Sequence, residues 1–162
     1  MARPRMPPAS FQNPDRLRAA NINPVTGLAT DYLNQYNEVA MLIGALADMP
    51  DMADDVLDWR PVGYPTHFAR TGFAERGLAI AGWLVVARDV KAQFCTVRAE
   101  LESRIADVQR RLAASRVPEL IANEAPAIFA DIARLGGVIN GGKGAPMLQQ
   151  SAAQDLVDSL FA

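Results

Sequence analysis

The residues with the clearest capacity for chemistry are four aspartates on one predicted helix. Asp51, Asp54, Asp55 and Asp58 recur at i, i+3, i+4 and i+7, so a helix over residues 51–59 carries all four carboxylates on one side. Carboxylate oxygens are the ligands that Mg²⁺ and Ca²⁺ prefer. However, the stretch lacks the glycine-centred spacing of an EF-hand loop and the Glu-x-x-His pair of di-iron bundles. A solvated acidic face is the favoured interpretation, and the four aspartates are weak candidates for a metal site.

A second candidate site follows in the loop over residues 60–67, which is rich in turn-forming residues. Thr66 is the expected N-cap of a short helical turn that contains His67 and Arg70. His67 is the only histidine, so it lacks the partners that metal binding or a catalytic triad requires. Tyr64, His67 and Arg70 could line a pocket for a small ligand or a phosphate, as the less favoured alternative to a purely structural loop.

Composition limits the classes of function. The chain has 162 residues, 50% hydrophobic and 21% charged, which fits one soluble domain with tails. Its formal charge of -2 argues against broad nonspecific binding to nucleic acid. The single cysteine, Cys95, excludes an intramolecular disulfide, and we expect it to be partly buried in packing. No cofactor is indicated.

The N-terminus lacks the apolar run of a secretory signal. The longest apolar run, Gly77 to Ala87, is shorter than the roughly 20 residues that span a bilayer. We therefore expect a cytoplasmic protein without membrane contact.

A long helical stem over residues 73–112, with a break near Arg88-Asp89, is the element around which the other predicted helices are arranged. In its second half apolar residues recur at steps of three and four, which draws one stripe along a helix. These residues are Val90, Phe94, Val97, Leu101, Ile105, Val108 and Leu112. The first half, Gly77 to Ala87, is apolar nearly all round, so it should be buried against other helices.

Further helices are expected over residues 28–47, 51–59, 118–123 and 126–138, and no segment has the alternation of a strand. The sequence therefore predicts an all-α protein, an antiparallel helical bundle around the stem. On the first of these helices, Tyr32 and Tyr36 either form a ledge for a ligand or lie at the edge of the core with their hydroxyls at the water boundary.

The predicted domain organisation has four parts. Residues 1–22, with four arginines against one acid, form a disordered basic arm. Residues 23–138 form the bundle domain, and 139–150 form a flexible glycine-rich linker. Gly137 to Lys143 matches part of a phosphate-binding loop, but Gly144 replaces the required Ser or Thr and a helix precedes it. Residues 151–162 form a C-terminal amphipathic helix.

This C-terminal helix begins with the capping box Ser151-x-x-Gln154. Its apolar edge and flanking acids consist of Asp155, Leu156, Val157, Asp158, Leu160 and Phe161. Because so short a helix is marginal in water, it must dock, either on its own bundle or on a partner.

The same six residues resemble the acidic-apolar terminal peptides with which chemotaxis phosphatases and flagellar-switch proteins bind a response regulator. The resemblance implies a mode of docking only. The glutamine-containing catalytic helix of those phosphatases has no counterpart here, since the nearest substitutes, Asp107 and Gln109, point in different directions on a helix. Separately, the segment from Asn23 through Pro61 resembles uncharacterised bacterial proteins, for which no activity follows.

The leading prediction is a non-enzymatic adaptor that presents its C-terminal helix to a protein partner, with a response regulator as one candidate. The alternative is a helical-bundle enzyme or a binder of a metal or small ligand, built from the acidic face over 51–58 and the loop over 64–70. A third hypothesis is a homo-oligomer with the stem stripe at the subunit interface.

Overall fold

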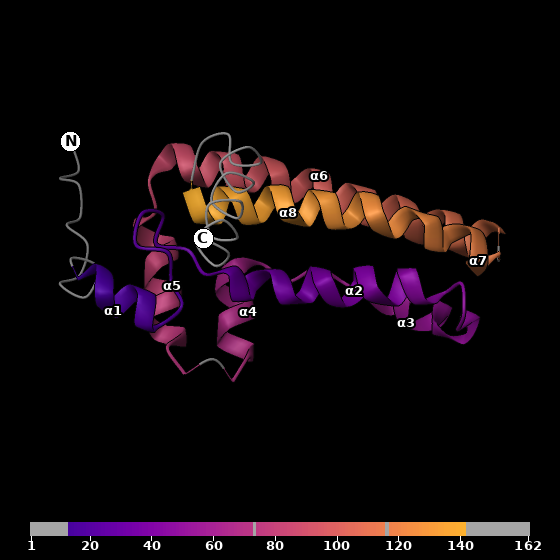
Figure 1. Cartoon of the computed structure of the whole chain (residues 1–162), viewed down its shortest axis with the longest axis horizontal. Helices are drawn as coiled ribbons and strands as arrows, with labels where there is room; N and C mark the ends of the chain where they lie inside the picture. Colours follow the sequence, from indigo (N-terminus) through magenta and orange to yellow (C-terminus); the bar gives the residue numbers. More distant parts are fainter. Residues whose placement is uncertain (1–12, 73, 116, 142–162) are drawn as a thin grey trace, which may run out of the picture. The chain divides into compact units, whose positions relative to one another are not determined.

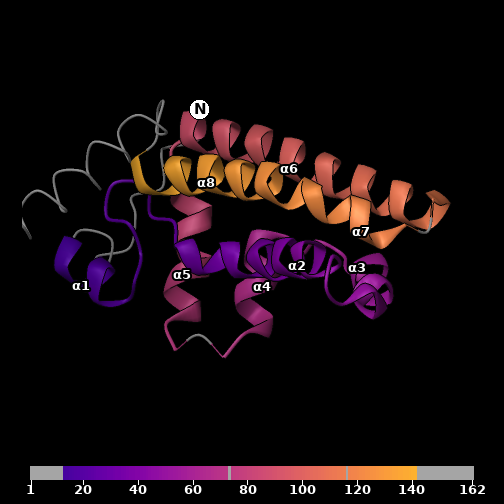
Figure 2. The same ribbon diagram turned by 45° about the vertical axis from the view of Figure 1, so that its right-hand side comes forward.

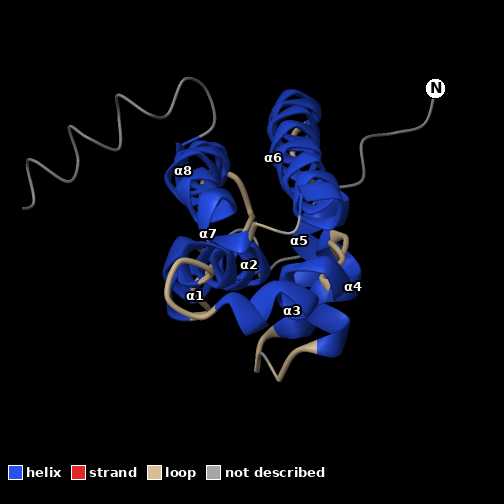
Figure 3. Cartoon of the chain, turned by 90° about the vertical axis from the view of Figure 1, so that its right-hand side faces the viewer, coloured by secondary structure: helices blue, strands red, loops and turns tan. Residues whose placement is uncertain are grey.

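The computed structural model describes residues 13–72, 74–115 and 117–141. All regular elements within these ranges are helical (Figure 3), and pairing of the strand type is limited there to one isolated antiparallel bridge between Ile22 and Ala29. The predicted all-α fold class is confirmed for this part of the chain.

Eight α-helices follow one another in the described ranges (Figure 1). They are α1 (Pro14–Ala19), α2 (Asn34–Ala45), α3 (Ala53–Asp58), α4 (Tyr64–Arg70), α5 (Arg76–Val85), α6 (Arg88–Ser115), α7 (Pro118–Ile121) and α8 (Ala125–Gly141). Short 3-10 turns cover Thr30–Leu33, Pro50–Met52 and Ala122–Glu124. The helices form two compact units. The first contains the described residues of 13–32, 63–94 and 136–141, and the second contains Leu33–Val62 and Cys95–Leu135, so each is built from separate stretches of chain.

The second unit is organised by the apolar stripe of α6. Leu101, Ile105 and Val108 are fully buried, and Leu112 is nearly so. The 125–135 part of α8 runs antiparallel beside α6 (Figure 1), as Figure 2 also shows. The predicted stripe is confirmed at Phe94, Leu101, Ile105, Val108 and Leu112, whereas Val90 and Val97 are only half-buried.

Polar side chains also join α6 to α8 in this unit. Arg104 Nε donates to Asp131 Oδ2 at 2.6 Å, and the Asp131 side chain is only 8% exposed. The hydrogen bond and the charge of this carboxylate raise the pKa of Arg104. Arg134 lies between Asp131, at 3.5 Å, and Glu100, at 2.9 Å. Four charged groups therefore fix the register of the two helices.

The first unit has an aromatic core. Tyr64 lies with its ring centroid 4.8 Å from Phe68, 5.1 Å from Trp83 and 5.2 Å from Tyr32. Phe94, at the end of this unit's part of α6, lies 5.2 Å from Trp83. These rings hold α4 beside α5 (Figure 2). Offset and tilted ring pairs of this kind contribute about 0.5–1.5 kcal/mol each beyond the area they bury.

The stem is two helices, and the break comes at Val86-Ala87, two residues before its predicted place. The expectation that its first half is buried all round is wrong. In α5 only Ala79 and Gly82 are buried, and the Leu84 side chain is 74% exposed. Ala79 and Gly82 are three residues apart and share one face of the helix, so α5 buries that face only.

The N-terminal arm also differs from its prediction, because residues 13–22 are folded. Asn13 caps α1 by accepting hydrogen bonds from the N–H groups of Asp15 and Arg16, and Pro14 occupies the first turn. Leu17 and Ile22 are buried with 1% exposure each. Residues 1–12 of the predicted arm lie outside the described residues.

Three helix boundaries differ as well. The helix expected from residue 28 starts as a 3-10 turn at Thr30, and α2 proper begins at Asn34. The α4 helix begins at Tyr64, after Gly63, so Thr66 is not its N-cap. The last helix, α8, continues through Gly136 and Gly137 to Gly141, so residues 139–141 of the predicted linker are helical. The rest of that linker, 142–150, and the C-terminal helix over 151–162 lie outside the described residues.

Candidate functional site

The predicted pocket over Tyr64, His67 and Arg70 does not assemble around the Tyr64 hydroxyl. The Tyr64 side chain is fully buried, and its Oη accepts a hydrogen bond from the backbone N–H of Ala29 at 2.9 Å. Burial raises the pKa of the Tyr64 phenol far above its usual range. Arg70, three residues beyond His67 in the last turn of α4, is exposed. Tyr64 is therefore a core residue that holds the N-terminal loop.

His67 is half-buried against aromatic rings. Its imidazole lies edge-on to Tyr32 at 5.4 Å and to Phe68 at 5.0 Å. Burial lowers the pKa of His67, while a hydrogen bond to the backbone of Asp31 and the charge of the Asp31 carboxylate act in the opposite direction. The net effect is a lower pKa, so His67 gains a proton at a lower pH in the folded protein than in the unfolded chain.

The acidic face of the second unit is exposed to solvent. All four aspartates of the predicted metal site, Asp51, Asp54, Asp55 and Asp58, lie at exposed positions on or beside α3. Across the described ranges, no three side chains of His, Cys, Asp or Glu are placed to hold a metal ion. The four carboxylates therefore do not converge on a common centre, as a solvated face requires.

Tyr32 and Tyr36, the alternative ligand ledge, are both fully buried. Tyr36 Oη donates to Glu102 Oε1 at 2.6 Å, which joins α2 to α6 in the second unit. Both tyrosines are thus part of the core rather than a surface ledge, and the Tyr36 hydroxyl meets a carboxylate rather than water.

Gln109, one of the two nearest substitutes for the phosphatase residues, has a structural role. Its Nε2 donates to the carbonyl oxygens of Val56 at 2.8 Å and Trp59 at 2.9 Å, at the end of α3. Asp107 accepts from Arg110 and Arg111 on its own helix. Cys95 is a free thiol at a half-buried position, as its sequence context predicts. The six residues of the predicted partner-binding peptide, Asp155, Leu156, Val157, Asp158, Leu160 and Phe161, lie outside the described residues.

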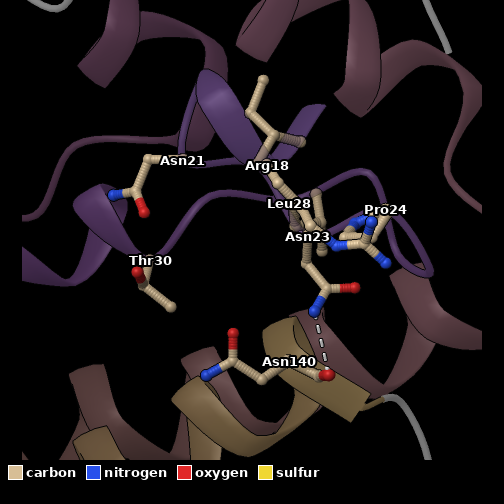
Figure 4. A pocket seen from close by; sticks show the side chains of 8 residues that line it. Arg18, Asn21, Asn23, Pro24, Leu28, Thr30 and Asn140 are labelled. Atoms are coloured by element: carbon tan, nitrogen blue, oxygen red, sulfur yellow. Dashed lines mark hydrogen bonds between the residues drawn. The ribbon is translucent and has the colours of Figure 1, made fainter. Parts of the chain in front are cut away.

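A polar pocket of about 270 Å³ lies in the first unit (Figure 4). Its apolar walls come from the loop that follows α1, and one residue of the last turn of α8 completes it. The lining residues are Arg18, Asn21, Ile22, Asn23, Pro24, Leu28, Thr30 and Asn140. Small-molecule sites are usually lined mainly by apolar side chains with a few polar groups, whereas most of the side chains that line this pocket are polar.

The loop is fixed to the end of α8 by side-chain hydrogen bonds. Asn23 Nδ2 donates to the carbonyl oxygen of Asn140 at 3.0 Å (Figure 4), and Thr26 Oγ1 donates to that of Ile139. Asn23 Oδ1 accepts from the N–H groups of Val25 and Thr26, at 2.9 and 3.1 Å, which closes a turn that Gly27 completes at φ 76°. Carbonyl groups in the last turn of a helix lack partners within the helix, so these two bonds stabilise both elements.

Asn21 has a left-handed backbone conformation, with φ 60°. Asparagine tolerates this region better than most residues. Its Nδ2 donates to Asp31 Oδ2 at 2.8 Å, so the orientation of the carboxamide is fixed and its oxygen is left as an acceptor. Sequence reasoning missed this pocket altogether. The turn-forming residues Asn23 and Pro24 were the one available signal, but Asn21 fell in the predicted disordered arm and Asn140 in the predicted linker.

Comparison of the chain with models of protein families, with curated proteins and with solved structures finds no match. Inference about function therefore depends on the residues themselves. None of the helices in the described ranges is both long enough and apolar enough to cross a bilayer.

Proposed function

We propose that this chain is a non-enzymatic interaction protein that presents residues 151–162 as a helix to a protein partner. One observation carries the proposal. The capping box Ser151-x-x-Gln154 precedes an apolar edge of Leu156, Leu160 and Phe161, and a glycine-rich stretch separates it from α8. An isolated helix of about twelve residues is marginal in water, so its apolar edge requires a cover.

The described part of the chain supports a scaffold role. Several polar side chains that could serve chemistry instead bind other parts of the described chain. The Tyr64 hydroxyl accepts from the N–H of Ala29, and the Tyr36 hydroxyl donates to Glu102. Gln109 donates to a carbonyl oxygen of α3. The exposed aspartates of α3 do not converge. These observations favour the interaction protein over the alternative of an enzyme or metal binder built from residues 51–70.

The side chains of residues 155–161 indicate the kind of surface that a partner would offer. Leu156, Leu160 and Phe161 would fill an apolar groove, while Asp155 and Asp158 would meet basic residues at its rim. A helix in a groove is a common mode of peptide recognition. Response regulators are the partner class that the resemblance of this peptide implies.

The test compares the full chain with a chain that ends at Pro146. Affinity capture from a bacterial lysate by the full chain identifies the partner, and calorimetry with the purified partner then measures the affinity of each chain. We expect the shortened chain to keep its helical circular dichroism and melting temperature and to lose binding. A fall of many degrees in the melting temperature would show instead that the peptide belongs to the bundle.

A matched pair of point variants sharpens this test. Leu160→Glu places a charge on the apolar edge and should weaken partner binding about 30-fold or more, the effect of losing an interface anchor. Ser159→Glu adds the same charge one residue earlier, off that edge, and should change the affinity by no more than about threefold. Equal effects of the two would contradict docking through the apolar edge.

A further inference from the structure

We propose that the polar pocket of the first unit binds a small molecule of amino-acid size that carries one carboxylate together with an amide or hydroxyl group. This site is independent of the C-terminal peptide. It is also distinct from the Tyr64, His67 and Arg70 set, none of which lines it.

The size and base of the pocket define the ligand's dimensions. Its volume of about 270 Å³ is just below the range of roughly 300–1,000 Å³ typical of sites for drug-sized ligands. Leu28 and Ile22 line it with apolar side chains that are themselves almost fully buried. They present almost no apolar surface to a ligand, so the mostly polar pocket suits a compact ligand with a short carbon skeleton and several polar groups.

Three polar side chains on this rim have hydrogen-bonding capacity left. Asn21 has its nitrogen bonded to Asp31, which leaves its oxygen as an acceptor. Among the described residues, no hydrogen bond uses the Thr30 hydroxyl or the Asn140 carboxamide. Figure 4 shows Asn21 and Thr30 on one side of the pocket and Asn140 across from Asn21. One acceptor, one hydroxyl and one carboxamide together match a ligand amide or hydroxyl group.

Arg18 supplies the charge that selects a carboxylate. Its guanidinium forms an ion pair with Asp15 at 3.2 Å, but the two side chains are 62% and 92% exposed. Exposed ion pairs of this kind contribute little to stability, so the guanidinium can leave Asp15 for a ligand carboxylate. Its paired N–H groups are well suited to bind both oxygens of a carboxylate. Asp31, whose carboxylate accepts a hydrogen bond from Asn21, is not one of the lining residues.

The rim is also held in place before any ligand arrives. Asn23 donates to the carbonyl oxygen of Asn140, and Thr26 donates to that of Ile139. The hydrogen bond to Asp31 fixes the Asn21 side chain. The Asn21 and Asn23 side chains, which are already ordered, lose little conformational entropy on binding, whereas Arg18 must first leave Asp15.

The experiment titrates the full ¹⁵N-labelled chain with three probes that have a carboxylate, L-serine, L-asparagine and L-lactate. Glycerol and acetamide serve as probes with the same polar groups and no carboxylate. We expect carboxylate probes alone to shift the backbone amide signals of Asn21, Thr30 and Asn140. If no probe shifts these signals at about 20 mM, or if the neutral probes shift them equally, the proposal is overturned.

Two variants and a control locate the binding. Arg18→Met and Asn140→Leu alter exposed side chains of the pocket, and each should weaken binding of the best probe at least about tenfold. Arg16→Met removes the same charge from α1 at a residue that does not line the pocket, and it should change binding less than about twofold. If the Arg16 and Arg18 variants weaken probe binding equally, the probe is attracted by the overall positive charge of α1, and the proposed site is wrong. Unchanged melting temperatures of all three establish that each variant is folded.

Discussion

The hydroxyl of Tyr64 accepts a hydrogen bond from the backbone N–H of Ala29, 35 residues earlier in the chain, at 2.9 Å. Both residues are fully buried. The bond joins the first residue of α4 to the loop that carries the polar pocket, and it satisfies an N–H group that has no access to water. Tyr64 thus links the aromatic core of the first unit to its N-terminal loop.

Tyr64→Phe should lower the free energy of unfolding by about 1–3 kcal/mol, since it removes the acceptor and leaves the buried Ala29 N–H unsatisfied. Chemical denaturation measures the change. Tyr36→Phe is the matched control. Its partner, Glu102, is half-exposed and can be hydrated instead, so we expect a smaller loss of about 0.5–1.5 kcal/mol. A Tyr64→Phe protein as stable as the original would show that this hydrogen bond contributes nothing.

Asp131→Ala should destabilise the second unit by about 1–3 kcal/mol, because its carboxylate is nearly buried and accepts from Arg104. Asp107→Ala also removes a carboxylate that meets two arginines, Arg110 and Arg111, but that side chain is 51% exposed. We expect it to cost no more than about 1 kcal/mol. Thermal denaturation measures the loss of stability in each variant. Equal losses of stability would indicate that burial does not strengthen the contacts of Asp131.

Gly44→Ala should stabilise the protein by about 0.5–1 kcal/mol, since glycine within a helix is unfavourable by that amount. Gly44 lies in α2, and a Cβ added there would be 3.4 Å from the Cβ of Ala125, at the near limit of ordinary contact. Gly77→Ala, in α5, is the control because a Cβ there meets nothing within 4 Å. If Gly77→Ala stabilises and Gly44→Ala destabilises, then the contact of α2 with Ala125 cannot yield by a few tenths of an ångström.

Stability should fall as the pH drops below about 6.5, and His67 should account for part of the change. The unfolded chain protonates His67 near its ordinary pKa of 6.5, whereas burial gives the folded protein a lower pKa. Between the two values the unfolded state holds more protons, so acid favours unfolding. His67→Gln should therefore reduce the difference in melting temperature between pH 7 and pH 5.5. An unchanged difference would show that His67 protonates equally in both states.

The parts of the fold that could be predicted from the sequence are those with long periodic patterns. The stripe of α6 repeats over several turns, so five of its seven predicted residues, from Phe94 to Leu112, are buried, whereas Val90 and Val97 are half-buried. The α1 helix has six residues and a single buried side chain, Leu17, in a segment rich in arginine and proline. No periodicity can emerge from so short a helix. Its Asn13-Pro14 start is a capping signal, but the composition of residues 1–22, rich in arginine and proline, predicts disorder.

The candidate sites were harder to predict because residue type does not specify a partner. A tyrosine hydroxyl near a histidine and an arginine fits a ligand pocket, yet Tyr64 meets the N–H of Ala29. Asn140 was expected in a linker, and its place beside Asn21 and Thr30 depends on tertiary structure. Such contacts between distant segments follow from packing and cannot be inferred from local pattern.

The hydrogen bond between Asn23 and Asn140 spans 117 positions of sequence, which has a consequence for the order of folding during synthesis. At roughly 5–20 residues per second, a ribosome adds Asn140 about 6 to 23 seconds after Asn23. Until then the loop has no helix end to bind, and contacts of such large separation form slowly even in a complete chain. The polar pocket is therefore expected to form only after Asn140 has been synthesised, later than the helices that precede it in the chain.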